Sequence, residues 1–198
     1  MALPETVRQL SEREYLDIER AAEFKSEFFD GEMFAMAGGT FRHSLLSTNC
    51  AGELRERLRG GRCLVCNADL RIKIAATGLL TYPDLSVICG PPQFVPGTDD
   101  TVLNPTVLVE VLSDSTEAYD RGKKFENYRQ IETLREYLLV SQKEPRIEQF
   151  IRQPDGCWVL NEAAGLKASL NLPSLQVTLS LAEVFANVHF VPVPLRPV

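Results

Sequence analysis

A charged residue interrupts an almost wholly apolar stretch of the chain. Glu110 lies within residues 106–112, TVLVEVL, between valines and leucines. A lone buried carboxylate is costly unless it pairs with a cation or binds a metal. Strand alternation places Glu110 on one face with Leu108 and Leu112, and the valines on the other face. Glu110 is therefore a candidate site residue.

A second carboxylate, Asp84, has a similar setting in the stretch TYPDLSVIC, directly after Pro83. If the two strands are neighbours, Asp84 and Glu110 can point at the same spot. A hard divalent cation such as Mg²⁺ or Mn²⁺ requires charged oxygens that are held rigidly, with some of its coordination positions left for water. The alternative, which the sequence leaves open, is that each carboxylate pairs with an arginine or a lysine at a sheet edge.

A lysine follows on the next predicted helix. Asp120 and Lys124 are four residues apart, and Tyr128 lies one turn further. A lysine held over the two carboxylates could stabilise the charge that develops on a phosphate, or orient an attacking water. The plainer alternative is an ion pair on the helix surface, which contributes roughly a few tenths of a kcal/mol.

Periodicity and turn residues predict the elements that must position these side chains. A capping box at Ser11 and Glu14 begins the first helix, and Asp30-Gly31 marks a hairpin turn. Strands are expected over 24–29, 32–37, 69–74, 81–89, 106–112, 136–140, 146–152 and 157–162. Helices are expected over 12–22, 41–59, 117–131 and 181–188. This order predicts a mixed α/β fold.

Length and composition set further limits. The chain has 198 residues, 44% of them hydrophobic, which predicts a single domain over 1–198 with an extended tail from about residue 189. The net charge of −6 argues against a protein that holds DNA by bulk charge. Five cysteines without a secretory signal are expected to be reduced thiols in the cytoplasm. No stretch is long and apolar enough to predict a membrane span.

The order of these blocks resembles a known family. A Pro-Asp at the start of one strand and an acidic residue inside the next resemble the PD-(D/E)XK nuclease superfamily. Over roughly residues 8–165, the chain is similar to the Uma-type family of restriction-endonuclease-like proteins. The similar blocks are FKSEFFDGEMFAMAGGTFRHSLL, YPDLSVIC, PTVLVEVLSDST, DRGKKFENYRQ and REYLLV. The resemblance implies a restriction-endonuclease-like core, α/β (mixed α+β), with a central mixed sheet flanked by helices.

The resemblance also implies roles for particular residues. Asp84 matches the metal-binding aspartate, and Glu110 matches the acidic residue of the (D/E)XK element. The lysine of that element would fall at Leu112, and leucine cannot replace it. Lys124, on the following helix, matches the substitute lysine of the family better than Lys123 does. The implied catalytic residues are thus Asp84, Glu110 and Lys124.

Three further residues are possible members of the site. Glu27 and His43 match family positions near it, and Asp120 accompanies Lys124 on the predicted helix. For His43, near the start of a helix, the plainer alternative is a local hydrogen bond at the helix end.

These residues predict Mg²⁺- or Mn²⁺-dependent hydrolysis of DNA phosphodiesters, with Asp84 and Glu110 holding the metal. Two rival functions remain open at this stage. One is a catalytically degenerate nuclease fold that serves as a binding or regulatory module. The other is a hydrolase that acts on RNA or on small phosphoesters. The apolar tail FVPVPLRPV further suggests a homodimer.

Several other motifs favour structural roles. Cys63 and Cys66 form a CxxC without a second pair at ligand spacing, so buried thiols are expected. Gly38-Gly39 lacks a Walker lysine and predicts a turn. The arginines at 55, 57, 59 and 62 lie among glutamates, which indicates a solvated helix face with a smaller chance of touching a DNA backbone.

Overall fold

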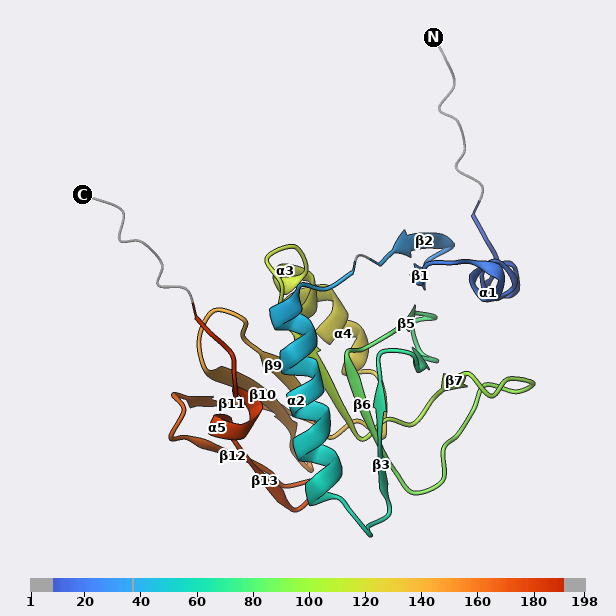
Figure 1. Ribbon diagram of the computed structural model, residues 1–198. Helices are drawn as coiled ribbons and strands as arrows, with labels where there is room; N and C mark the ends of the chain where they lie inside the picture. Colours follow the sequence, from blue (N-terminus) through green and yellow to red (C-terminus); the bar gives the residue numbers. More distant parts are fainter. Residues whose placement is uncertain (1–8, 37, 191–198) are drawn as a thin grey trace.

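The computed structural model describes residues 9–36 and 38–190, arranged in three sheets and a set of mostly short helices (Figure 1). The helices are α1 (Glu12–Ala21), α2 (Phe41–Arg57), α3 (Glu117–Tyr119), the π-helix η1 (Asp120–Lys124), α4 (Phe125–Tyr128) and α5 (Leu181–Val184). The strands are β1 (Ser26–Phe29), β2 (Glu32–Ala35), β3 (Cys63–Asn67), β4 (Arg71–Lys73), β5 (Leu80–Thr81), β6 (Leu85–Cys89), β7 (Thr101–Val102), β8 (Val107–Val111), β9 (Glu136–Val140), β10 (Arg146–Arg152), β11 (Trp158–Ala164), β12 (Ser169–Leu172) and β13 (Val177–Ser180).

The largest sheet is mixed and has six strands in the order β11-β10-β9-β8-β6-β3. All its neighbouring pairs are antiparallel except β8 and β9, which are parallel. A parallel pair requires a crossover connection, and the segment α3–η1–α4 provides it. Every residue of β8 is buried, as its apolar sequence predicts for a strand covered on both faces.

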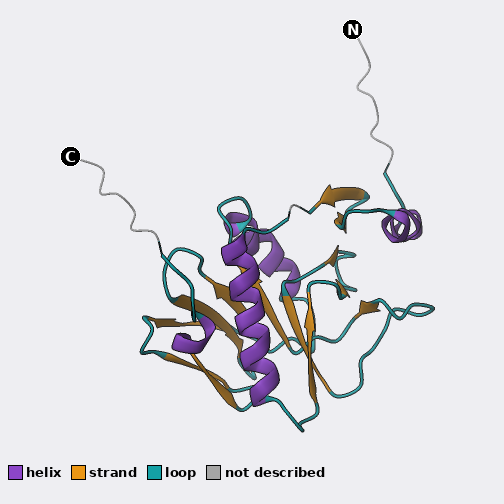
Figure 2. Ribbon diagram, in the orientation of Figure 1, coloured by secondary structure: helices purple, strands orange, loops and turns teal. Residues whose placement is uncertain are grey.

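Helices cover both faces of this sheet (Figure 2). On one face, Leu46, Cys50 and Leu54 of α2 pack on the odd-numbered valines of β8. On the other face, the crossover segment packs Phe125 and Tyr128 against the even-numbered side. The central mixed sheet flanked by helices confirms the predicted fold class.

A second sheet, in the order β2-β1-β5-β4-β7, holds the N-terminal hairpin beside the larger sheet. Its turn is the predicted one, since Asp30 and Gly31 have φ values of 50° and 82°. The capping box that begins α1 is also formed, by Ser11 and Glu14. Phe28 of β1 pairs with Leu80 of β5, so the hairpin is fixed to the body of the protein.

Some element boundaries differ from those predicted. The expected strand over 81–89 is split into β5 and β6, because Pro83 between them has no N–H to donate to a neighbouring strand. The helix expected over 117–131 is divided by a π turn. The β12–β13 hairpin was not predicted at all. Residues 191–198 of the expected tail lie outside the described residues, so the homodimer stays a prediction.

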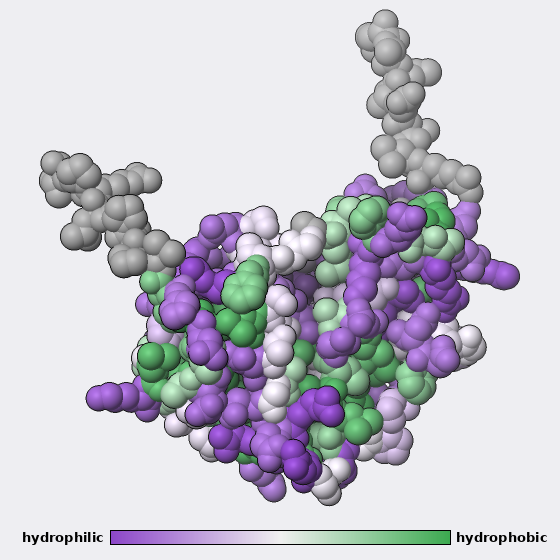
Figure 3. Space-filling view, in the orientation of Figure 1, coloured by the Kyte–Doolittle hydropathy of each residue, from purple (hydrophilic) through white to green (hydrophobic). Residues whose placement is uncertain are grey.

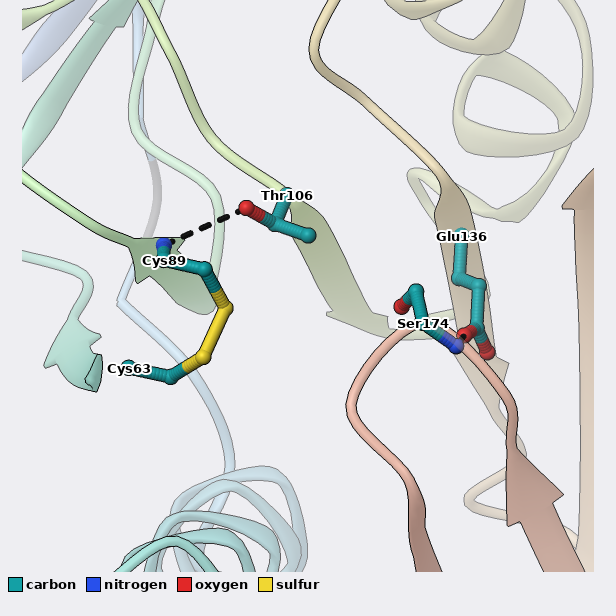
Figure 4. Close-up of a disulfide and its surroundings, with 5 residues drawn as sticks. All are labelled: Cys63, Cys89, Thr106, Glu136 and Ser174. Atoms are coloured by element: carbon teal, nitrogen blue, oxygen red, sulfur yellow. Dashed lines mark hydrogen bonds between the residues drawn. A yellow bond between two sulfur atoms is a disulfide. The ribbon is translucent and has the colours of Figure 1, made fainter. Parts of the chain in front are cut away.

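The cysteines correct one prediction. Cys63 and Cys89 form a disulfide (Figure 4), although all five cysteines were expected to be reduced. The cause is strand register, because β3 and β6 are antiparallel neighbours and Cys63 pairs directly with Cys89. Cys50, Cys66 and Cys157 are free thiols.

Across residues 9–36 and 38–190, no helix has both the length and the apolar character needed to cross a membrane.

Candidate functional site

A buried lysine is at the centre of the candidate site. The side chain of Lys124 lies among three carboxylates, and the whole residue is only 5% exposed. Its Nζ lies 2.9 Å from Glu110 Oε1 and 3.3 Å from Glu27 Oε1. Asp120 Oδ1 lies 3.6 Å away. The structure thus brings Lys124 together with Glu110, Asp120 and Glu27, which the sequence placed in three separate segments.

The π turn η1 explains how the helix directs Lys124 inward. It covers Asp120 to Lys124, and both of these residues are buried. Tyr128, four residues further, is buried on the same side. π turns are rare and occur frequently at functional sites. The pair Asp120–Lys124 is therefore not the solvent-exposed ion pair that the plainer interpretation of the sequence suggested.

Two tyrosines complete the surroundings of Lys124. The Tyr128 hydroxyl donates to Glu110 Oε1 at 2.8 Å, and the Tyr119 hydroxyl donates to Glu27 Oε2 at 3.2 Å. Both rings also lie close to the lysine, with centroids 6.0 Å and 5.9 Å from Nζ. Ammonium groups are attracted to aromatic faces at such distances. The cation is therefore held in one position from several sides.

Asp84 is held at the end of the neighbouring strand. Its Oδ2 accepts a hydrogen bond from the Val111 N–H at 2.7 Å and lies 3.1 Å from His43 Nε2. The register of β6 and β8 pairs Leu85 with Val109, and its continuation places Asp84 opposite Glu110. The charge of Asp84 is close enough to raise the pKa of Glu110. The two carboxylates therefore belong to one cluster.

Burial and charge set the protonation states in this cluster. Burial raises the pKa of Glu110 to about 8, although the charge of Lys124 acts in the opposite direction. Burial also raises the pKa of Asp120. For Lys124, burial alone would lower the pKa, but Glu110, Glu27 and Asp120 together outweigh it and hold the pKa well above its usual value. Lys124 is thus a charged ammonium throughout the physiological pH range.

A stability measurement can test the His43–Asp84 contact. The hydrogen bond to Asp84 is the main reason that the pKa of His43 is raised, although burial acts against it. A raised folded-state pKa means that protonated His43 stabilises the fold below its unfolded pKa, and that this stabilisation is lost as pH rises through the folded pKa. We expect His43→Gln to lower the free energy of unfolding at pH 6 by roughly 1–2 kcal/mol, and by less at pH 9. Urea unfolding in the presence of a chelator measures both values.

His189 provides the control for this experiment. It is an exposed histidine, and His189→Gln should leave the unfolding free energy unchanged at both pH values. If His43→Gln lowers the free energy of unfolding equally at pH 6 and pH 9, the charge on His43 contributes nothing to stability.

The donor set of the cluster fits a hard divalent cation. The closest contacts of the two carboxylates fall on Glu110 Oε1 and Asp84 Oδ2, which leaves Glu110 Oε2 and Asp84 Oδ1 for a cation. Within the described part of the chain, no group of three or more His, Cys, Asp or Glu side chains forms a complete metal site. Mg²⁺ does not need one, since it commonly binds one or two carboxylates together with waters and substrate phosphates.

Sequence reasoning missed some members of the cluster. Thr81 donates from its hydroxyl to Glu27 Oε1, and Tyr119 donates to the other oxygen. Tyr137 donates to the Asp120 carbonyl at 3.1 Å. Thr81 and Tyr137 lie in predicted strands, where such residues are common, so nothing in the sequence distinguished them. Tyr128 is spaced four residues after Lys124, a signal that indicated a shared face but no role.

Comparisons with known proteins agree with this architecture. The crystal structure of a "putative nuclease belonging to DUF820" from Anabaena variabilis superposes with a TM-score of 0.71 at 18% identity. The match covers 88% of this chain and 96% of that one, and shows a common fold. Two uncharacterized Synechocystis proteins are also similar. The protein slr1290 is 38% identical, with 92% of this chain and 94% of that protein covered. The protein sll1609 is 33% identical, with 89% and 100% covered.

A family model matches most of the chain. Residues 13–183 match the model of the Uma2 family, whose description is "Putative restriction endonuclease". The matched range includes both central strands, the π turn and every residue of the cluster described above. This chain, with its mixed sheet and its buried lysine among carboxylates, belongs to the Uma2 family of restriction-endonuclease-like proteins.

Proposed function

We propose that the protein is a metal-dependent endonuclease that hydrolyses DNA phosphodiester bonds. The observation that supports this most directly is the buried ammonium of Lys124, 2.9 Å from Glu110, beside the strand end at which Asp84 is fixed. Two carboxylates that could hold a metal and a permanently charged amine in one cluster are groups that metal-dependent phosphodiester hydrolysis can use. The family description supports nuclease function in general.

Each residue of the cluster has a distinct role in this proposal. Asp84 and Glu110 would hold Mg²⁺ or Mn²⁺, and the bound metal would supply Lewis-acid polarisation of the scissile phosphate. Lys124 donates to the phosphate oxygen on which negative charge increases in the transition state. His43 fixes the orientation of the Asp84 carboxylate through its contact at 3.1 Å.

Two carboxylates act on Lys124 rather than on the substrate. Glu27 and Asp120 keep the lysine charged and in place, since both lie within 4 Å of its Nζ. Glu27 comes from the N-terminal hairpin, and Thr81 and Tyr119 donate hydrogen bonds to it. The position of the Lys124 ammonium group therefore depends on the second sheet as well as on the first.

The proposal is tested by plasmid cleavage. We expect the purified protein to nick supercoiled DNA with Mg²⁺ or Mn²⁺, and not in the presence of a chelator. Asp84→Ala should lower the single-turnover rate about 10²-fold or more, because the cation loses a ligand. The exposed Asp155→Ala is the matched control and should cleave at the parent rate.

The same experiment decides between the rival functions. Metal-dependent cleavage of RNA or of a small phosphodiester, without cleavage of DNA at the same metal and salt concentration, would replace the proposed substrate. Nucleic-acid binding without any turnover in either metal would instead support a catalytically degenerate binding module.

A further inference from the structure

The part of the chain that contributes Glu27 to the candidate site is held by few apolar contacts. We call α1, β1 and β2 the N-terminal module. Its buried apolar side chains pack with Leu80 in a small cluster that is separate from the two larger clusters on the faces of the central sheet. Phe24 and Phe34 remain 77% and 48% exposed, and Figure 3 shows hydrophobic residues on the surface of this module. Apolar burial alone therefore does not explain how the module is oriented.

Backbone pairing between the module and the body of the protein is also sparse. Among the described residues, the ladder between β1 and β5 has one paired position. Because this ladder is antiparallel, its continuation places Glu27 opposite Thr81, and Ser26 opposite Tyr82. Successive side chains of a strand point to opposite faces, so the two pairs lie on opposite faces. The first pair faces Lys124, and there the Thr81 hydroxyl donates to Glu27.

Glu19 of α1 bridges the second pair. Its Oε1 accepts hydrogen bonds from the Ser26 N–H and from the Tyr82 hydroxyl, each at 3.0 Å, and its Oε2 accepts from the Ser26 hydroxyl. Tyr15 donates to the Ser26 carbonyl at 2.6 Å, so the peptide group that joins Ser26 to Glu27 is also fixed. All of these residues are buried. The bridge is therefore shielded from water.

The bridge requires a carboxylate at position 19. The Ser26 and Tyr82 groups that bind Glu19 are all donors, and an ionised carboxylate is a side-chain group that only accepts. Among residues 9–36 and 38–190, Glu19 forms no ion pair. A cation lies one hydrogen bond further on, because the Tyr82 hydroxyl accepts from Arg71 Nε at 2.9 Å. Burying a carboxylate without a direct cation costs stability, so stability alone does not favour glutamate here.

The two ends of the bridge differ in how firmly they are held. Tyr82 lies two residues before Asp84. The Asp84 carboxylate is fixed independently, by the Val111 N–H at 2.7 Å and by His43 at 3.1 Å. The serine end belongs to the sparsely attached N-terminal module. The Tyr82 end is therefore the anchor, and Ser26 is the end that the bridge holds in place.

We propose that Glu19 is a positioning residue, which fixes Glu27 and through it the Lys124 ammonium relative to the proposed metal ligands. Glu27 directly follows the bridged serine, and its Oε1 lies 3.3 Å from Lys124 Nζ. Loss of the bridge would release β1 and with it one of the carboxylates that hold the lysine. The inference rests on the proposed function, because a positioning role requires that this site cleaves.

Glu19→Gln tests this role, because it keeps the size of the side chain and places an N–H₂ group against a donor. We expect single-turnover cleavage of supercoiled DNA to fall about tenfold or more, because Lys124 acts on the transition state. Mn²⁺ affinity should stay at the parent value, since Asp84 keeps its own hydrogen bonds. Affinity for a 24-base-pair duplex in a chelator should also be unchanged. Rapid-quench cleavage, Mn²⁺ titration and fluorescence anisotropy measure the three quantities.

Combined variants show whether Glu19 acts through the lysine. In the Lys124→Ala background, Glu19→Gln should cause no further loss of cleavage rate, because the group that it positions is absent. If the two losses multiply, the inference is wrong.

Tyr82→Phe tests the same bridge with a smaller change, since it removes the anchoring hydroxyl and keeps the ring. We expect cleavage to fall about threefold with Mn²⁺ affinity unchanged. Tyr82→Phe should add no loss when it is combined with Glu19→Gln. This variant decides the question if Glu19→Gln does not fold.

Glu136→Gln is the matched control. Glu136 is also a fully buried carboxylate that accepts a backbone N–H, from Ser174 at 2.7 Å, but it holds the turn between β12 and β13 instead. We expect this variant to lower the free energy of unfolding in urea and to leave the cleavage rate at the parent value. If Glu136→Gln slows cleavage as much as Glu19→Gln does, the effect is a general loss of stability and the inference is wrong.

The Lys124 ammonium group provides a measurement that does not depend on cleavage. Exposed ammonium protons exchange rapidly with water, so a buried ammonium stands out in a ¹H–¹⁵N spectrum of lysine side chains, and its absence in Lys124→Arg assigns it. Glu19→Gln should shift this resonance, and Glu136→Gln should not. A folded Glu19→Gln protein with an unchanged Lys124 resonance or the parent cleavage rate would overturn the inference. If the parent protein does not cleave at all, the proposed function fails, whereas a shifted resonance still supports the positioning of the lysine by Glu19.

Discussion

Lys124→Ala is expected to lower single-turnover cleavage of supercoiled DNA about 10²-fold or more, the scale of losing one electrostatic stabiliser of the transition state. Mn²⁺ affinity should be kept, because Lys124 is not a metal ligand and contacts Glu110 Oε1, whereas Oε2 is the oxygen proposed for the cation. The fold should also lose stability, since three buried carboxylates lose their cation. Breaking a buried pair in this way costs about 3–5 kcal/mol, and less where Glu110 takes up a proton. Rapid-quench cleavage, Mn²⁺ titration and urea unfolding measure the three effects.

The chain provides a matched control at the preceding position. Lys123 is more than half exposed and pairs with Glu126 on the helix surface, so Lys123→Ala should change none of the three quantities appreciably. Lys124→Arg keeps the positive charge and should keep the fold. Its cleavage rate therefore reports the role of the lysine in catalysis separately from its role in stability. If a folded Lys124→Ala protein cleaves as fast as the parent, the proposed role of the lysine is wrong.

Glu110→Gln is expected to weaken Mn²⁺ binding about tenfold or more and cleavage about 10²-fold or more, so that both losses occur together. The substitution keeps the shape of the side chain but removes the anionic charge that a hard cation requires. Tyr128 can still donate to the amide oxygen of glutamine, so the local packing should remain. Isothermal titration with Mn²⁺ and single-turnover cleavage at several metal concentrations separate weaker binding from slower chemistry.

Glu126→Gln is the corresponding control. Glu126 is an exposed carboxylate on the same crossover segment and pairs with Lys123, so its substitution should leave metal affinity and cleavage unaltered. A Glu110→Gln protein that binds Mn²⁺ as tightly as the parent would remove Glu110 from the set of metal ligands.

The sequence predicted those parts of the fold that local physics determines. A carboxylate inside TVLVEVL could only be a paired or ligand-binding group, and Glu110 is indeed paired with Lys124 inside a fully buried strand. The hairpin at Asp30-Gly31 was also predictable, because positive φ at both positions is a local property of those residue types. The family resemblance supplied the central mixed sheet flanked by helices, which periodicity alone does not give.

Features that depend on register and long-range packing could not be predicted. The disulfide requires Cys63 opposite Cys89, and the pairing of β3 with β6 that achieves this is invisible in a list of cysteine positions. Thr81 and Tyr119 bind Glu27 across three separate segments, and both are ordinary residues in their own neighbourhoods. The π turn divides the predicted helix and is not marked by any sequence signal, although the four-residue spacing of Lys124 did predict its shared face with Asp120.

That π turn also bears on how the lysine of the candidate site could change position during evolution. Tyr128 lies eight residues after Asp120, whereas two turns of a regular α-helix contain about seven. The segment therefore contains one residue more than a regular helix needs to keep Asp120 and Tyr128 on one face. Gain or loss of that single residue would leave both ends in place and shift only the side chain between them. An insertion of this kind offers a route by which a lysine absent from position 112 could be replaced by one on the crossover helix, without any change to the sheet.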